Sequence, residues 1–423
     1  MTGLAVTPEQ GVMRTVLPNG LTVLSESVPG VRSVAFGAWV RAASMHEPPE
    51  RMGIAHMLEH MVFKGTTRYT ARELALALEV LGGSLDAYTT REHTSYQARV
   101  LDEHLTQACD VIGQLVFEPL LRDADLRLER KVILEEIAMV DDTPDDVVFD
   151  LHAAAMYPGH PYGYTILGTP DTVRAITADD LQALHARSYA PDRVVVAAVG
   201  SVTHEALLDA LERTGWTTRP AGTLAPPVAP VPMAPVTGRS HVRKRDASQV
   251  HFVIGGAAPR HDAPDRQALS VATTLLGGGM SSRLFQRVRE DLGLAYTVYS
   301  FTNTQADMGQ HGVYVATNPE QGVQALDVVF EEMGAVAAGA MDDAEIATGI
   351  SQLKGQTVLS LDGLGARLYR AAGVALYDEP YKSLSELLAE LDAITPAQVR
   401  AACAAYLDPT RTYTLSLGPT RAS

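Results

Sequence analysis

Two histidines and a glutamate lie close together in the stretch R-M-G-I-A-H-M-L-E-H-M-V-F-K-G-T, residues 51–66. They are His56, Glu59 and His60, in the pattern H-x-x-E-H. The apolar residues around them favour a helix that Gly65 ends, and residues four apart on a helix share one face. Two imidazoles on one face can bind one metal ion, and the glutamate can serve as general base for water at that ion. The pattern indicates metal-assisted hydrolysis, with zinc as the metal.

The motif by itself does not decide the chemistry, because five residues can match by chance. With 13 histidines in 423 residues, an accidental H-x-x-E-H is expected in roughly a few per hundred chains of this composition. Buried histidines that only pack are also commoner than metal ligands. A third protein ligand distinguishes the two readings, since catalytic zinc usually has three and leaves the fourth position for water.

The third ligand is predicted from a helix over residues 123–140. Glu129 and Glu136 lie two turns apart on its apolar stripe, whereas Glu135 lies off the stripe, where Lys131 can pair with it. A carboxylate on a buried helix face is costly unless it is paired or binds a metal. We therefore predict Glu136 as the third ligand and Glu129, about 10 Å away along the axis, as a group beside the site. The alternative is two partly exposed edge positions. The apolar stripe consists of Leu126, Val132, Ile133, Ile137 and Val140.

Composition and charge exclude several classes of protein. A chain of 423 residues is expected to form two or more domains. The net charge of −16 argues against nucleic acid and against an anionic membrane surface as partners. We expect no secretory signal, because the start of the sequence lacks a basic segment followed by an apolar one. We expect no membrane span, because the sequence has no run of 18 apolar residues. Cys109 and Cys403 fit no metal motif and no disulfide framework, so the cytoplasm is the expected compartment.

Periodicity places these motifs on elements. Residues 70–81 are predicted to form a helix with Thr70 as N-cap and Glu73 completing a capping box. His160 lies in a loop rich in proline and glycine and is interpreted as loop packing, since two histidines and a glutamate already suffice for the metal. The other predicted strands are 21–28, 33–40, 84–90, 94–101 and 193–200, and the other helices are 103–117, 123–140 and 177–189.

The second half of the chain repeats the first. Residues 176–200 match 394–418 at an offset of 218, and P-P-E-R-M-G matches A-P-D-R-Q-A at an offset of 215. At the latter offset Val271, Thr274 and Leu275 stand where the first half has its histidines and glutamate. The second copy therefore cannot hold the metal, but it can contribute a surface that grips substrate.

We expect an α+β protein with two homologous α/β domains, each a mainly antiparallel sheet packed with helices. The predicted zinc-bearing domain is 1–216 and the homologous domain without metal is 238–423. Residues 217–237 are rich in proline and alanine, so we expect a semi-extended linker. In the second domain Arg289 and Tyr296 lie seven apart. Both can donate hydrogen bonds to a peptide carbonyl or an oxyanion, although a surface arginine and a strand tyrosine are the simpler interpretation.

These features together resemble the pitrilysin family of zinc peptidases, the group of insulin-degrading enzyme and the mitochondrial processing peptidase. The resemblance covers nearly the whole chain. Its length is similar to the processing-peptidase branch, whose members work as two-chain clamshells, so each chain would be half of a clamshell. The motifs that carry it are H-M-L-E-H-M-V-F-K-G-T, L-D-A-Y-T-T-R-E-H-T-S-Y, V-I-L-E-E-I-A-M-V-D-D-T-P, H-P-Y-G and S-R-L-F-Q-R-V-R-E-D-L-G-L-A-Y.

The resemblance implies roles for individual residues. In the family the third zinc ligand is the second glutamate of E-E-I, 76 residues after the second histidine, which here is Glu136. Glu129 matches an additional acidic residue of the catalytic site. Arg289 and Tyr296 match the arginine and tyrosine that hold substrate from the second half of the chain.

The substrate-binding strand departs from the family pattern at one position. It usually reads N-A-[YF]-T, and here it is Asp86, Ala87, Tyr88 and Thr89. The added carboxylate could favour basic residues in the peptide or could simply be solvated. The glycine-rich loop of non-catalytic partner subunits is reduced to G-G-G at residues 277–279, so the chain resembles the catalytic type.

The expected function is that of a zinc endopeptidase with one Zn²⁺ per chain, although manganese or cobalt would also suit these ligands. Glu59 would be the general base, and the peptide would add as a strand beside residues 84–90. We expect a homodimer in which Arg289 and Tyr296 of the partner subunit complete the site. One alternative is a non-catalytic core or partner subunit of the same fold. Another is a dedicated maturation protease for one precursor peptide.

Overall fold

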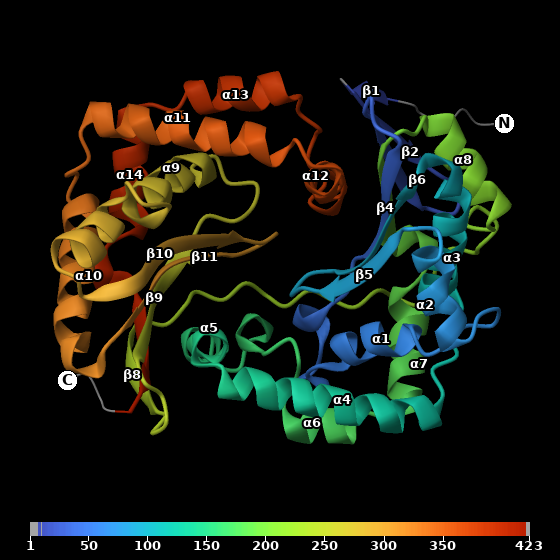
Figure 1. The fold of residues 1–423 in the computed structure, drawn as a ribbon, viewed down its shortest axis with the longest axis horizontal. Helices are drawn as coiled ribbons and strands as arrows, with labels where there is room; N and C mark the ends of the chain where they lie inside the picture. Colours follow the sequence, from blue (N-terminus) through green and yellow to red (C-terminus); the bar gives the residue numbers. More distant parts are fainter. Residues whose placement is uncertain (1–6, 10, 420–423) are drawn as a thin grey trace. The chain divides into compact units, whose positions relative to one another are not determined.

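The computed structural model describes residues 7–9 and 11–419, and the chain forms two compact units, each built around its own β-sheet (Figure 1). Unit 1 combines the chain up to residue 137 with 164–230 and 360–383. Unit 2 combines residues 138–163 and 231–359 with the chain from 384 onward. The predicted domains, 1–216 and 238–423, follow the order of the chain, whereas each unit combines segments from both halves. The predicted boundaries refer to the duplicated halves and remain a prediction.

The sheet of unit 1 has seven strands among the described residues, in the order β1-β2-β3-β7-β4-β6-β5. β3 and β7 are parallel and every other pair is antiparallel. β5 lies at the edge of the sheet. The strands are β1 (Thr7–Glu9), β2 (Val12–Val16), β3 (Thr22–Ser27), β4 (Ser33–Val40), β5 (Ser84–Thr89), β6 (Thr94–Leu101) and β7 (Val194–Gly200).

Helices cover both faces of this sheet, which explains why the central strand β7 is a continuous apolar run with every residue buried. Val194, Val196 and Ala198 face the larger core, whereas Val195, Ala197 and Val199 pack against α12. In Figure 1, α2, α3 and α8 lie on one side of the sheet and α12 on the other. The helices of this unit are α1 (Ile54–Val62), α2 (Ala71–Glu79), α3 (Leu105–Phe117), α6 (Pro170–Ala175), α7 (Ala178–Ser188), α8 (His204–Arg213), α12 (Leu364–Leu376) and most of α4 (Asp123–Asp142).

Unit 2 has a five-stranded sheet within the described residues, in the order β10-β11-β9-β12-β8. The strands are β8 (Gly238–Arg243), β9 (Val250–Ala258), β10 (Ala295–Thr304), β11 (Gly309–Thr317) and β12 (Tyr413–Gly418). The helices are α5 (Pro144–Met156), α9 (Arg266–Gly277), α10 (Gly322–Ala337), α11 (Asp343–Ser360), α13 (Leu384–Asp392) and α14 (Pro396–Tyr406), with a π-helical segment η6 (Phe285–Asp291).

The two sheets have the same topology, which confirms the predicted duplication. β8-β12-β9-β11-β10 repeats β3-β7-β4-β6-β5, with the one parallel pair in the same place. The halves of the chain also exchange one helix. α5, from the first half, packs on β9 and β12 of unit 2, and α12, from the second half, packs on β3, β4 and β7 of unit 1. No prediction from the sequence anticipated this exchange.

Most predicted elements agree with the structure. Strands 33–40 and 94–101 have the predicted bounds, and α2 begins after Thr70, whose capping box with Glu73 is formed. The predicted apolar stripe of α4 was wrong at Val132, which is 50% exposed. Val132 lies one residue before the buried Ile133, about 100° around the helix axis, and so points away from the core. No helix of the described chain is long and apolar enough to cross a bilayer.

Candidate metal centre

Helix α1 is fixed at its N-terminus before it presents its histidines. Gly53 precedes it with φ of 89°, and a Cβ there would lie 2.5 Å from the Leu167 carbonyl oxygen, so only glycine fits. The helix has no side-chain cap at that position. Instead Glu47, buried in the preceding loop, accepts hydrogen bonds from the backbone N–H groups of Gly53 (2.8 Å) and Ala55 (2.7 Å). A side chain of the loop therefore satisfies two of the backbone donors at the start of the helix.

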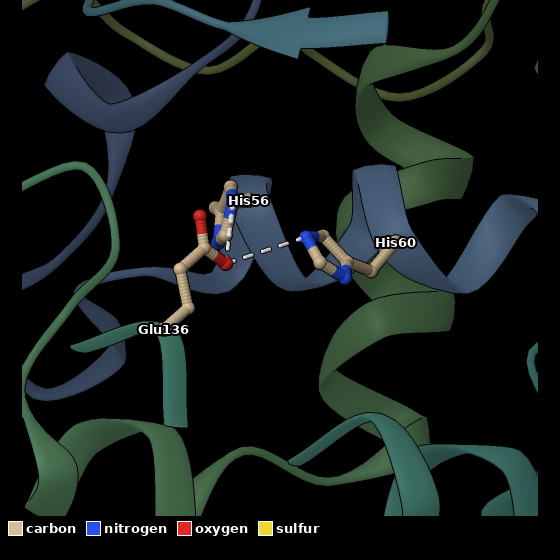
Figure 2. A group of neighbouring side chains, drawn as sticks. All are labelled: His56, His60 and Glu136. Carbon is tan, nitrogen blue, oxygen red and sulfur yellow. Dashed lines mark ion pairs between the residues drawn. The ribbon is translucent and has the colours of Figure 1, made fainter. Parts of the chain in front are cut away.

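His56 and His60 of α1 and Glu136 of α4 point toward one another (Figure 2). Glu136 Oε2 lies 3.7 Å from His56 Nε2 and 3.7 Å from His60 Nε2. One ligand atom from each residue lies within 4.8 Å of the other two. The predicted ligands, far apart in sequence, are thus brought to one place.

These residues fit a zinc ion. The contacts at 3.7 Å are longer than hydrogen bonds, and ligands about 2 Å from a shared tetrahedral ion lie about 3.4 Å apart. Burial, together with the charge of His60, lowers the pKa of His56 to about 3, which keeps its imidazole neutral and able to bind a metal. Two imidazoles and one carboxylate are a ligand set typical of catalytic zinc.

His60 is oriented from its other ring nitrogen. Its Nδ1 lies 3.2 Å from Glu129 Oε2, and the second oxygen of Glu129 lies 2.6 Å from Lys64 Nζ. Glu129 is buried, so the lysine ammonium compensates a charge that burial would otherwise make costly. With Nδ1 held by the carboxylate, Nε2 is left for the metal. Glu129 thus lies beside the ligands, where the sequence predicts it.

Glu59 is held next to these ligands by strand β5. Its side chain is buried, and Thr89 Oγ1 donates a hydrogen bond of 2.5 Å to Glu59 Oε2. Burial raises the pKa of Glu59, while the Thr89 hydroxyl and the charge of His60 act in the opposite direction. A carboxylate with a raised pKa beside a metal site suits a general base.

The predicted substrate-binding strand is β5 itself. Its residues Asp86 to Thr89 pair with Gln97 to Thr94 of β6 in antiparallel register. On its other side β5 has no strand partner among the described residues, so its backbone groups are available there. Asp86 is exposed, and it shares a face with Tyr88, whereas Ala87 packs against the main core and Thr89 reaches Glu59.

Arg289 and Tyr296 lie together in unit 2. The Arg289 guanidinium carbon is 4.3 Å from the centroid of the Tyr296 ring, and Arg289 Nη1 donates to the Tyr296 carbonyl oxygen at 3.3 Å. The Tyr296 side chain is 75% exposed.

His160, which the sequence assigns to loop packing, has its Nε2 2.9 Å from the Val231 carbonyl oxygen. It is not in the ligand cluster found among the described residues.

Comparison with family models identifies both halves of the chain. Residues 22–170 match the model described as insulinase, peptidase family M16, and residues 175–353 match the model described as peptidase M16 inactive domain. The chain belongs to the M16 family of peptidases. The second model covers most of the second half of the chain, in which Val271, Thr274 and Leu275 stand where the first half has its two histidines and glutamate.

Relatives of this M16 member carry matching names. An uncharacterized zinc protease of Streptomyces coelicolor is 40% identical, covering 92% of this chain and 86% of the relative. A probable mitochondrial-processing peptidase subunit beta of Arabidopsis thaliana is 33% identical, with 93% and 76% covered. The solved structure of a protease from Helicobacter pylori has a TM-score of 0.89 at 21% identity, over 96% of this chain and 99% of that one, and shows the same fold. The names of these relatives therefore support a zinc protease at the level of the family.

Two contacts of this M16 site are absent from the predictions. Glu47 is not suspected from the sequence, because it precedes α1 by seven residues and no helical period connects them. Lys64 is also missed, although a buried Glu129 requires a nearby cation and Lys64 belongs to the same motif as His60. The hydrogen bond from Thr89 to Glu59 is a third detail that only the structure shows.

Proposed function

We propose that this M16 peptidase is a zinc-dependent endopeptidase that hydrolyses peptides or unfolded segments of polypeptides. The convergence of His56, His60 and Glu136 on one point is the observation that supports it best. These residues would hold a single zinc ion per chain. Zinc bound there supplies a Lewis acid that polarises the scissile carbonyl and makes a coordinated water more acidic.

The side chains of unit 1 provide the proton transfers. Glu59 accepts a proton from the attacking water and passes it to the leaving amine. Thr89 fixes one carboxylate oxygen of Glu59, which leaves the other oxygen for the proton. Glu129, neutralised by Lys64, keeps the His60 ring in one orientation.

The substrate backbone adds to the free edge of β5. Peptide N–H and C=O groups pair with the unpaired backbone groups of β5, so recognition is largely independent of sequence. The exposed Asp86 carboxylate is available to a basic side chain of the docked peptide. Arg289 and Tyr296, which both carry hydrogen-bond donors, bind substrate and the developing oxyanion.

We further propose a homodimer in which Arg289 and Tyr296 of the partner subunit complete each site. A non-catalytic partner subunit is the competing function, and the intact cluster of ligands with a buried glutamate beside it argues against that reading. Loss of catalysis would remove the requirement for such a costly arrangement of buried polar groups.

The variant Glu59→Gln tests the proposed reaction. It keeps the size of the side chain and the Thr89 contact but cannot accept the proton. We expect kcat for a fluorescent casein substrate to fall by about 1,000-fold, within the range of general acid–base catalysis, with zinc content unchanged. Glu103→Gln, at an exposed glutamate, is the matched control and should retain wild-type activity. Full activity in Glu59→Gln would overturn the proposal.

A further inference from the structure

Helix α12 contacts the strand that is proposed to dock substrate. The ring centroid of Tyr369 on α12 lies 5.7 Å from that of Tyr88 on β5 and 6.3 Å from that of Trp39 on β4. The Tyr369 hydroxyl accepts a hydrogen bond of 2.8 Å from Gln97 Nε2 on β6. Trp39 Nε1 donates to the Tyr88 hydroxyl at 3.4 Å. One side chain of α12 therefore touches three neighbouring strands at the edge of the sheet.

The same helix reaches the turn of the β5–β6 hairpin and is tied to the sheet at its own C-terminus. The Tyr377 hydroxyl, just after α12, donates to Glu92 Oε2 in the hairpin turn at 2.7 Å. Arg41, just after β4, donates to the carbonyl oxygens of Leu376 (2.8 Å) and Ala375. A guanidinium at the C-terminus of a helix satisfies carbonyls that lack helical partners. The hairpin is thus held from one face at two points.

The opposite face of β5 is held by the catalytic helix. Thr89 follows Tyr88 in the strand and points to the other side, where it binds Glu59. Two adjacent residues of β5 therefore fasten it between α12 on one face and α1 on the other. An edge strand without a second neighbour depends on such contacts for its position.

Unit 2 contains the same arrangement. Phe149 of α5, the other exchanged helix, lies 5.5 Å from Phe301 of β10 and 5.4 Å from Tyr314 of β11, measured between ring centroids. β10 is the edge strand that corresponds to β5. In each unit the exchanged helix packs an aromatic ring on the edge hairpin of the sheet, which indicates a common role for this contact.

We infer that Tyr369 is a positioning residue: it sets the place of β5 and thereby the docking of the peptide strand. The inference rests on the proposed function for its effect on substrate, but its effect on β5 does not. Without the Tyr369 ring, the Tyr88 side of β5 loses its support from α12, while Thr89 keeps its own contact with Glu59. Docking should therefore weaken much more than the chemical step.

The test compares Tyr369→Leu, Tyr369→Phe and the control Tyr381→Leu. Phenylalanine keeps the ring contact with Tyr88. Tyr381 follows α12, and the Arg370 guanidinium lies over its ring. In Tyr369→Leu we expect the backbone amide hydrogens of residues 84–89 to exchange about tenfold faster, the factor that corresponds to the energy of an aromatic pair. The KM for fluorescent casein should rise by a similar factor. The kcat should change less than twofold. Tyr381→Leu should resemble wild type, and Tyr369→Phe, which keeps the ring and loses only the hydrogen bond from Gln97, should lie much closer to wild type than Tyr369→Leu.

Each outcome decides one point. Equal exchange of residues 84–89 in Tyr369→Leu and Tyr381→Leu would overturn the inference. Faster exchange with an unchanged KM in an active enzyme would overturn the connection to docking. Faster exchange in a protein that cleaves no casein would support the positioning role while contradicting the proposed function. Tyr377→Phe provides a milder variant, because it removes only the hydroxyl that donates to Glu92 in the hairpin turn. In this variant hydrogen exchange of residues 84–89 should rise by a smaller factor than in Tyr369→Leu.

Discussion

At the scale of single residues, the centre of the site is a series of contacts in which each side chain is held in place by the next. Lys64 neutralises Glu129, Glu129 fixes the Nδ1 side of His60, and the Nε2 side of His60 faces Glu136. Buried charges are tolerated only in such paired arrangements. The same principle explains why Glu59, also buried, takes a hydrogen bond from Thr89.

Thr89→Val tests this last contact with almost no change in side-chain shape. The hydroxyl lowers the pKa of Glu59, so its removal raises that pKa. Because the base must be ionised to work, the acidic limb of the pH profile of kcat/KM should move to higher pH. We expect kcat/KM at neutral pH to fall about tenfold, as for loss of a hydrogen bond to a charged group.

The control is Thr89→Ser, which keeps the hydroxyl and should restore both the rate and the position of the acidic limb. A Thr89→Val enzyme with the wild-type pH profile would show that the threonine does not influence the general base.

At the scale of elements, the histidine helix depends on a loop residue for its first turn. Glu47 supplies the acceptor that a cap residue would normally provide. We predict that Glu47→Ala lowers the free energy of unfolding by about 1–3 kcal/mol, because two buried N–H donors lose their partner. Urea denaturation measures the change. Glu50→Ala, at an exposed glutamate of the same loop, should cost far less, and equal losses in the two variants would contradict the capping role.

Features of helices and strands could be predicted from the sequence where they depend on the periodicity of an element. The helical spacing of α4 correctly placed Glu129 on its buried side and left Glu135 exposed, since a period of 3.6 residues fixes faces. Val132 was misassigned because apolar character alone does not exclude exposure. Glu47 and Lys64 could not be predicted, because their partners are set by tertiary packing and not by spacing along one helix.

At the scale of the whole molecule, duplication supplies two sheets of equal topology, and the predicted metal ligands belong to only one of the two halves. The offsets of 215 and 218 residues predicted this repetition, because related halves keep their order of elements. The exchange of α5 and α12 could not be predicted in this way, because the apolar face of a helix does not show which of two related sheets it covers. Its consequence is that residues of the second half, such as Tyr369, act on the edge strand of the first unit.

The proposed homodimer is tested by mixing two inactive proteins. Glu59→Gln lacks the general base and Tyr296→Phe lacks a substrate-binding hydroxyl. If the partner's Tyr296 completes each site, a mixed dimer contains one intact site. Allowing for random reassortment, about a quarter of the wild-type activity should return. Mixing without any recovery, after subunit exchange has been verified, would contradict the shared site.

The most direct test of the central claim is the zinc content of wild type, Glu136→Gln and Glu135→Gln, measured with casein hydrolysis on the same samples. Glu136 lies at the ligand cluster, whereas the adjacent Glu135 is exposed on another face of α4. The account predicts about one zinc per chain in wild type and Glu135→Gln, and less than about a tenth of that, without hydrolysis, in Glu136→Gln. Wild-type zinc content and activity in Glu136→Gln would contradict it.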